Sequence, residues 1–311
     1  MKSDDSSLEI QDLIAVEARA KLLLDRAEAW GRFPTPVEDI LAAANLRVAP
    51  KSMFDPVNIL AYIKQKGEAA VTTLKTFKSA LSKVFGIYDA NEQIIHIDDK
   101  VKSAKQTFLK LHETGHHELP AHRKLFSVFQ DCELTLAPEI ADLFERQANN
   151  FARYALFQGN GFQVRAADSA MSIKTPMSLA KDFGASIYAS CREFARTHHR
   201  SCVVYALEPM EGFGAKVRRI EPSPSFLAQF GRPSDTYIDF NHALGTLLPV
   251  NLQRMVKPTH LVFRDKNGVD HECLGESFKT PFNILLLIYP IKALTATSII
   301  VPVSYQSIRQ S

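Results

Sequence analysis

Apolar residues recur at helical spacing along the first half of the chain. Residues 8–30 and 37–44 each carry an apolar face, and the glycine- and proline-containing segment 31–36 separates them. The face of the first predicted helix is made by Leu13, Ala15, Ala18, Leu22 and Leu23. Residues 55–84 predict one or two further helices, with Gly67 where a break would fall. This part of the chain is therefore predicted to be mainly helical.

Short β-rich runs interrupt the helical pattern. Residues 46–48 predict a small strand, and the apolar runs 84–88 and 93–97 flank the polar turn 89–92. Two such runs around a polar turn predict a hairpin. Its edge could bind an extended peptide by main-chain hydrogen bonds, or both strands could serve only as core.

After residue 200 the pattern changes to short apolar runs separated by glycine, proline and asparagine. Strands are predicted at 202–207, 216–220, 236–240, 260–263, 270–274, 282–289 and 298–303. We therefore predict the α+β class, with a mainly helical domain and its small sheet at 1–160, a helical connector at 161–200, and a β-rich, mostly antiparallel domain at 201–311.

Composition and charge narrow the functional classes. The chain has 311 residues, 46% of them hydrophobic, and its net charge of +3 gives no support for strong binding to nucleic acid or to a membrane surface. The N-terminus lacks the cationic and apolar segments of a secretory signal. The apolar run 282–294 is too short for a membrane span and is broken by Pro290 and Lys292, so it predicts a buried strand. The cysteines form no close pair and indicate reduced thiols, which predicts a cytoplasmic protein without a membrane partner.

The candidate chemistry lies at residues 112–116, His-Glu-Thr-Gly-His. His112 and His116 stand one helical turn apart, so a helix presents both imidazoles to one metal ion. A carboxylate beside two metal-bound histidines, here that of Glu113, can act as general base toward water. This is the His-Glu-x-x-His motif of metallopeptidases, which also occurs in proteins without a metal.

A catalytic zinc site needs a third protein ligand. Glu145 is the best candidate, because it lies in a helical run where Ala148, Asn149 and Ala152 share its face. Small residues on that face allow a second helix to pack closely. The alternative is an ordinary surface glutamate, which is common early in a helix because of the helix dipole.

These motifs resemble those of the ImmA/IrrE family of metallopeptidases, whose members cut helix-turn-helix repressors in bacteria and mobile elements. The matching segments are 112–116 and 145–152, and 33–43 and 94–98 look like the family's opening helix and the strand before the metal helix. The chain departs from the family's usual ending of the third-ligand helix at 155–159, and its predicted helical segment at 55–83 is long for the family.

The resemblance implies a zincin-like peptidase domain with Zn²⁺ as cofactor, Mn²⁺ being the alternative. It implies His112, His116 and Glu145 as ligands and Glu113 as the catalytic base. It also implies a helix-turn-helix repressor as the protein substrate, in a stress-response or mobile-element circuit. The β-rich C-terminal domain would then be a regulatory module similar to GAF domains.

Two roles within this scheme stay open. The oxyanion formed during peptide hydrolysis could be stabilised by Tyr88, His117 or His122. Residues 117–142 could cover the cleft or pack outside it as a short helix.

A rival interpretation is a protein- or DNA-binding regulator that does not cleave. Residues 177–194 have the spacing of a helix-turn-helix unit, with Ser186 as a helix cap. The cations at 196–200 are explained by a solvated helix C-terminus, so direct DNA binding is not expected. The oligomeric state is not predicted.

Overall fold

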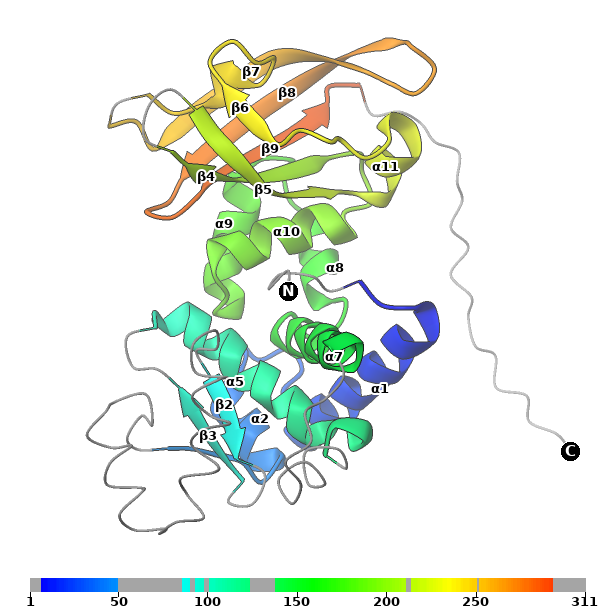
Figure 1. Ribbon diagram of the computed structural model, residues 1–311, viewed down its shortest axis with the longest axis vertical. Coiled ribbons are helices and arrows are strands. Elements are labelled where there is room, and N and C mark those ends of the chain that lie inside the picture. Colours follow the sequence, from blue (N-terminus) through cyan, green and yellow to red (C-terminus); the bar gives the residue numbers. More distant parts are fainter. Residues whose placement is uncertain are drawn as a thin grey trace, which may run out of the picture. The chain divides into compact units, whose positions relative to one another are not determined.

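The chain divides into two units, Met1–Thr197 and His198–Ser311, and helices make up most of the described part of the first. The computed structural model describes residues 7–49, 86–89, 93–97, 101–123, 138–210, 214–250 and 252–292. The helices described in the first unit are α1 (Ile10–Arg26), α2 (Val37–Ala43), α5 (Ser103–Glu118), α7 (Pro138–Leu156), α8 (Gly161–Ala167), α9 (Lys174–Phe183) and α10 (Ile187–Thr197) (Figure 1).

The helices predicted at 8–30 and 37–44 are confirmed, with one boundary shifted. Helix α1 ends at Arg26, and Glu28 adopts the left-handed backbone region with a φ of 47°, so the chain turns before Trp30. Several predictions lie outside the described residues. These are the helical segment 55–84, most of the linker 117–142 with Cys132, and the strand 298–303.

Helices α5 and α7 pack very closely. A Cβ atom added at Gly115 of α5 would lie 3.1 Å from the Cβ atom of Phe151 in α7. Ala148, one turn before Phe151, and Ala152, directly after it, are fully buried. Small side chains therefore set the distance between the two helices, as the pattern of the second helix predicts.

The small sheet lies next to α5 in the first unit. Its order is β1-β3-β2, formed by β1 (Arg47–Val48), β3 (Ile94–Ile97) and β2 (Gly86–Asp89). Strands β2 and β3 pair antiparallel with Tyr88 opposite Ile95, so the predicted hairpin pairing is confirmed. Strand β1 joins β3 in parallel, and β2 is at the edge of the described sheet.

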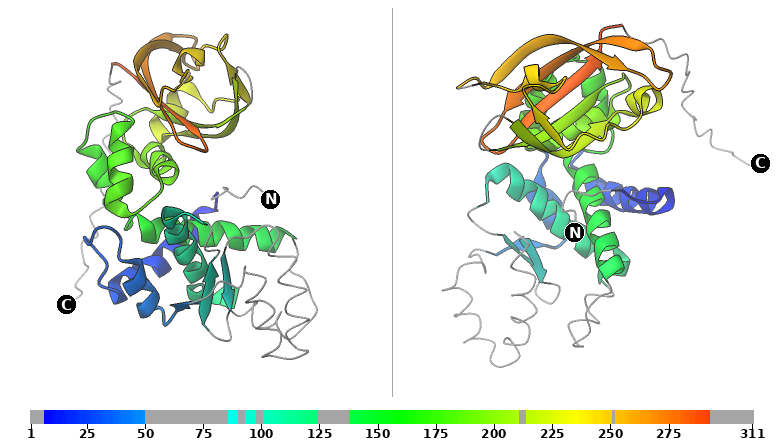
Figure 2. Two further views of the ribbon diagram at one scale, coloured as in Figure 1. Left: turned by 90° about the vertical axis from the view of Figure 1, so that its left-hand side faces the viewer. Right: turned by 45° about the horizontal axis from the view of Figure 1, so that its top comes forward.

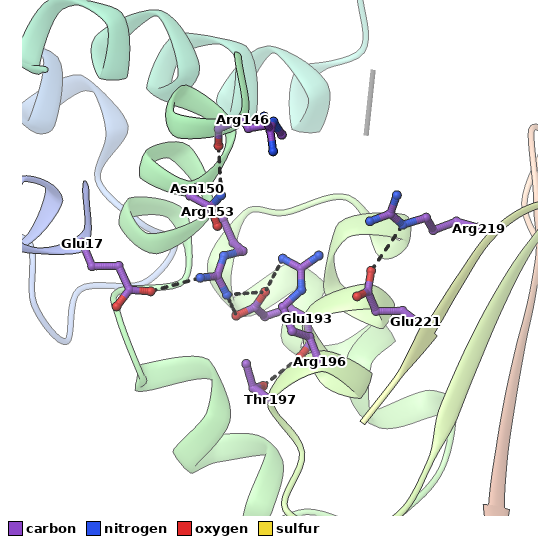
Figure 3. A network of polar contacts seen from close by, with 9 residues as sticks. All are labelled: Glu17, Arg146, Asn150, Arg153, Glu193, Arg196, Thr197, Arg219 and Glu221. Atoms are coloured by element: carbon purple, nitrogen blue, oxygen red, sulfur yellow. Dashed lines mark hydrogen bonds and ion pairs between the residues drawn. The ribbon is translucent and has the colours of Figure 1, made fainter. Parts of the chain in front are cut away.

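An ion-pair network joins α1, α7 and α10 inside the first unit (Figure 3). Arg153 of α7 lies 3.2 Å from a carboxylate oxygen of Glu193 in α10 and 3.1 Å from one of Glu17 in α1. The side chains of Glu193 and Arg153 are only 4% and 16% exposed. Burial, with repulsion from Glu193, raises the pKa of Glu17 although Arg153 opposes this. The helix α10, assigned above to a connector, is thus tied to the helices around residues 112–145.

Helices α9 and α10 are joined by a tight turn. Gly184 ends α9 in the left-handed region with a φ of 70°, a conformation that glycine adopts without steric cost. The Ser186 hydroxyl accepts a hydrogen bond from the Ala189 backbone N–H at 3.1 Å, which confirms the predicted cap.

The second unit contains a curled antiparallel sheet of six described strands in the order β6-β5-β4-β9-β8-β7 (Figure 2). They are β4 (Val203–Pro209), β5 (Gly214–Pro222), β6 (Tyr237–Asp239), β7 (Met255–Arg264), β8 (Asp270–Lys279) and β9 (Ile284–Pro290). The apolar run at 282–294 supplies β9, which pairs with β4 and β8 and is buried along its whole length. The buried strand predicted there is confirmed, and no helix in the described ranges is long and apolar enough to cross a membrane.

One helix of the second unit was not predicted. Helix α11 (Pro224–Phe230) begins at Ser223, whose hydroxyl accepts a hydrogen bond from the Phe226 N–H at 3.2 Å. The Ser-Pro pair that precedes it is a recognised start signal. Phe226 packs into the core of the curled sheet, so α11 closes one side of that core.

Candidate metal centre

Three side chains of the first unit converge on one point. The Nε2 atoms of His112 and His116 lie 3.2 Å apart. The Glu145 carboxylate oxygens lie 3.3 Å from His112 Nε2 and 3.6 Å from His116 Nε2. These are the distances expected for donor atoms that share one ion, since zinc bonds of about 2.0–2.2 Å place neighbouring ligands roughly 3.2–3.6 Å apart.

Helix geometry and helix packing together produce this arrangement. His112 and His116 occupy successive turns of α5, and both side chains are buried. Glu145 comes from α7, which Gly115 allows to approach α5 closely. The half-exposed Glu145 carboxylate, at 40% of its full exposure, leaves the donor group open to solvent on one side. An open side is what separates a catalytic zinc site from a closed structural one.

The hydrogen bond made by the outer ring nitrogen of His112 tests whether the residues fit a metal ion. His112 Nδ1 lies 3.1 Å from the Asn149 side-chain oxygen, which can only accept a hydrogen bond. The hydrogen of neutral His112 must therefore be on Nδ1, which leaves the Nε2 lone pair facing Glu145 and His116. Lone pairs and a carboxylate at this separation repel one another unless a cation lies between them, so the donor set fits a metal ion.

The pKa values of His112 and Glu145 are both shifted by their proximity. Burial alone would lower the pKa of His112, but hydrogen bonding and charge attraction from Glu145, with smaller effects of Glu113 and Asn149, raise it. Burial raises the pKa of Glu145, and the two histidines outweigh this and lower it strongly. Both shifts come from attraction between the Glu145 carboxylate and the imidazoles, so the carboxylate favours positive charge at this position.

Glu113 lies beside this donor group and is not part of it. Its side chain is buried, and its charge acts on His112. Within the described residues, the group of side chains that could hold a metal ion consists of His112, His116 and Glu145. The identity of that ion is not fixed by the donor set.

The three candidates for the oxyanion differ in position. Both ring nitrogens of His122 are engaged, Nδ1 with His116 at 3.0 Å and Nε2 with Gln147 at 2.8 Å, so the ring has no nitrogen left for an oxyanion. His117 is buried against the backbone carbonyl of Ala44, and burial lowers its pKa. The side chain of Tyr88 lies outside the described part of the structure, so its role stays a prediction.

Burial and the neighbouring His116 lower the pKa of His122 to about 3, so His122 is neutral near pH 7. Sequence reasoning missed the contacts of His122, Gln147 and Asn149. The signal for Asn149 was its position one turn after Glu145, whereas nothing in the sequence links Gln147 to His122.

Fold and site together define an α+β protein with a candidate two-histidine, one-glutamate metal centre in its helical unit. No protein-family model matches the chain, and no curated protein matches it. Among solved structures it is similar to one described as a Mycobacterium tuberculosis transcriptional regulator, with a TM-score of 0.53 and 11% sequence identity over 88% of this chain and 75% of that one. Similarity at that identity shows a shared fold, and the ImmA/IrrE resemblance stays a prediction.

Proposed function

We propose that this protein is a metal-dependent endopeptidase of the ImmA/IrrE type, with a zincin-like catalytic domain. The observation that carries the proposal is the convergence of His112, His116 and Glu145, whose donor atoms lie 3.2–3.6 Å apart. The adjacent Glu113 supports it further, because a buried carboxylate next to a ligand histidine is the base that peptide hydrolysis requires.

Zinc at such a site supplies a Lewis acid that polarises a peptide carbonyl and lowers the pKa of water to about 7. Glu113 accepts the proton of the attacking water as the new carbon–oxygen bond forms. It then donates this proton to the peptide nitrogen as the carbon–nitrogen bond breaks, so that protons balance over the reaction. His112, His116 and Glu145 would hold the ion, and the Glu145 side chain, 40% exposed, would leave one side accessible.

The proposed substrate is a helix-turn-helix repressor. The support is the resemblance of segments 112–116 and 145–152 to the repressor-cutting family. The β-rich second unit is proposed to regulate or recruit and not to catalyse, as a GAF-like module would, because every residue of the candidate centre lies in the first unit.

A second candidate function is a regulator that binds protein or DNA without cleaving. The observation that favours it is the likeness to a transcriptional regulator over 88% of the chain. In that case the metal centre would be structural, or would respond to metal concentration.

The test uses the full chain loaded with zinc and a proteome-derived peptide library whose new N-termini are labelled and sequenced. We expect new N-termini with the wild-type protein and none with Glu113→Gln, although Glu113→Gln should still contain one zinc per chain. His116→Ala should lose both metal and activity. Wild-type protein that binds zinc but releases no new N-termini, from the library or from helix-turn-helix proteins, would favour the non-cleaving regulator.

A further inference from the structure

A chain of hydrogen bonds leads from the candidate metal ligand His116 through His122 to Gln147 of α7. His116 Nδ1 lies 3.0 Å from His122 Nδ1, and His122 Nε2 lies 2.8 Å from Gln147 Oε1. His122 is fully buried and stacks on Phe144 with ring centroids 3.9 Å apart. Its ring is therefore held in one orientation between a ligand and a side-chain amide.

The direction of this chain decides which nitrogen of His116 carries a hydrogen. Gln147 Oε1 can only accept, so His122 Nε2 must donate, and neutral His122 then has a lone pair on Nδ1. That lone pair accepts the Nδ1–H of His116, which leaves His116 Nε2 without a hydrogen where it faces Glu145. In the opposite arrangement His122 Nδ1 would donate to His116 Nδ1. His116 Nε2 would then carry a hydrogen at the position where a ligand lone pair is needed.

Helix α7 thus supports both histidines of α5 from behind. Asn149 contacts His112 directly, and Gln147 acts on His116 through His122. The second route is less obvious because His122 lies beyond the end of α5, which stops at Glu118.

We propose that His122 and Gln147 are positioning residues that fix the tautomer of His116 for metal binding. This inference rests on the metal centre of the proposed function and is independent of peptidase activity. Outer partners of metal-bound histidines contribute about 10–100-fold to metal affinity. His122 is assigned neither a ligand role nor contact with substrate.

The test measures the zinc dissociation constant by competition with a chromophoric chelator. His122→Leu removes the acceptor and should raise this constant about 10–100-fold. In His122→Asn the side-chain oxygen takes the position of Nδ1 and can only accept from His116, so affinity should return close to the wild-type value. Visible absorption of the Co²⁺-loaded proteins should show the wild-type coordination in His122→Asn and a changed spectrum in His122→Leu.

A double-mutant cycle separates tautomer control from packing. Gln147→Met keeps the side-chain length, but methionine cannot replace the oxygen that accepts the hydrogen bond from His122 Nε2. This substitution should therefore weaken zinc binding in the wild-type background. In the His122→Asn background it should have no effect, because asparagine has no tautomer to fix. As a matched control, Gln106→Met removes the hydrogen bond from Gln106 to the Val101 carbonyl, on the same α5 helix, and should leave zinc affinity unchanged.

Equal effects of Gln147→Met in both backgrounds, or no effect in either, would overturn the proposal, and so would a His122→Asn variant as weak as His122→Leu. If His122→Leu fails to fold, the two Gln147→Met comparisons still decide. A comparison of the wild-type protein with His112→Ala tests the metal centre separately. If the wild type binds zinc and His112→Ala does not, the centre is established whether or not His122 fixes the tautomer of His116. Zinc binding without peptide cleavage would overturn only the peptidase proposal.

Discussion

Gly115 of α5 and Phe151 of α7 are in direct contact, and a Cβ atom on Gly115 would lie 3.1–3.2 Å from three carbon atoms of the phenylalanine side chain. Phe151 is fully buried and has little room to move. The metal centre bridges these same two helices, so their separation sets the distance from Glu145 to the histidines.

Gly115→Ala should lower the stability of the protein and weaken zinc binding. Alanine gains about 1 kcal/mol over glycine in a helix interior, but overpacking costs about 1–3 kcal/mol, and we expect the steric cost to win because Phe151 is buried. Chemical denaturation and chelator competition measure the two effects. Gly161→Ala is the control, because a Cβ there meets only ordinary contacts of 3.6 Å or more. A Gly115→Ala variant more stable than wild type, with unchanged zinc affinity, would show that the helices separate easily.

Zinc should stabilise the folded protein through the three proposed ligands. At a free zinc concentration 100 times the dissociation constant, the free energy of unfolding should rise by about 2.7 kcal/mol. His112→Ala should show no such increase. The measurement is thermal unfolding with and without a chelator. An equal zinc-dependent stabilisation of the wild type and His112→Ala would place the bound zinc elsewhere.

Breaking the ion-pair network at Arg153 should be costly. Arg153→Met removes the positive charge between Glu17 and Glu193, and it leaves the Glu193 side chain, only 4% exposed, with Arg196 at 3.9 Å as its remaining ion-pair partner. Removing one partner of a buried pair typically costs about 3–5 kcal/mol. Arg32→Met is the control, because Arg32 pairs with Asp39 where both side chains are about half exposed, and such pairs contribute about 0–1 kcal/mol. A comparable loss in both variants would argue against a special role for the network.

Acid should destabilise the second unit through His198, which is buried in the folded protein. Burial, with repulsion from His199 and Arg200, lowers the pKa of His198 to about 4. The unfolded chain binds a proton below about pH 6.5, so stability present at neutral pH is lost as the pH falls toward 4, by about 2 kcal/mol at pH 5. His198→Asn keeps an acceptor for the Arg200 N–H and should remove this loss. Hydrogen exchange in β4 and β9 provides the measurement, and an unchanged pH dependence in His198→Asn would contradict the assignment.

Truncation tests where the first unit ends. A chain stopped after Arg200 should retain zinc, because the first unit extends to Thr197 and holds all three proposed ligands. A chain stopped after residue 160 should fail to fold, because it loses α8, α9 and α10. Their fully buried side chains include Phe162, Phe183 and Phe194, and Glu193 is the buried partner of Arg153. Zinc content and circular dichroism of the two fragments show whether each one folds. A stable fragment ending at residue 160 would support a first domain that ends there.

Local spacing was sufficient to predict what lies within one helix. The two histidines of α5 and the small-residue face of α7 follow from a period of 3.6 residues, and the strand β9 follows from an unbroken apolar run. Contacts between distant segments were not predictable in this way. Glu118 lies two residues after the motif, yet its partners Arg19 and Arg26 lie in α1, and no local pattern encodes that pairing.

The outer contacts of the centre show the same limit. His122 was a candidate for stabilising the oxyanion, because nothing around it in the sequence indicates that Gln147 of another helix engages it. The segment 161–200 was predicted to be a connector, because residues 177–194 have the spacing of a separate helix-turn-helix unit. The salt bridge from Glu193 to Arg153, 40 residues earlier, is what joins it to the first unit.

The order of strands in the second unit bears on how the protein folds during synthesis. Strand β4 is the first strand of its sheet to be made and β9 the last described one, yet they are neighbours, with Val203 opposite Ile288. The centre of the sheet therefore cannot form until β9 has left the ribosome, and closing so long a loop makes sheet formation slow. The first unit depends on no such late segment within its described helices. It can fold around residues 112–145 while the edge of β4 that pairs with β9 is still open, so the nascent chain exposes an apolar strand edge for longer than it exposes the candidate metal centre.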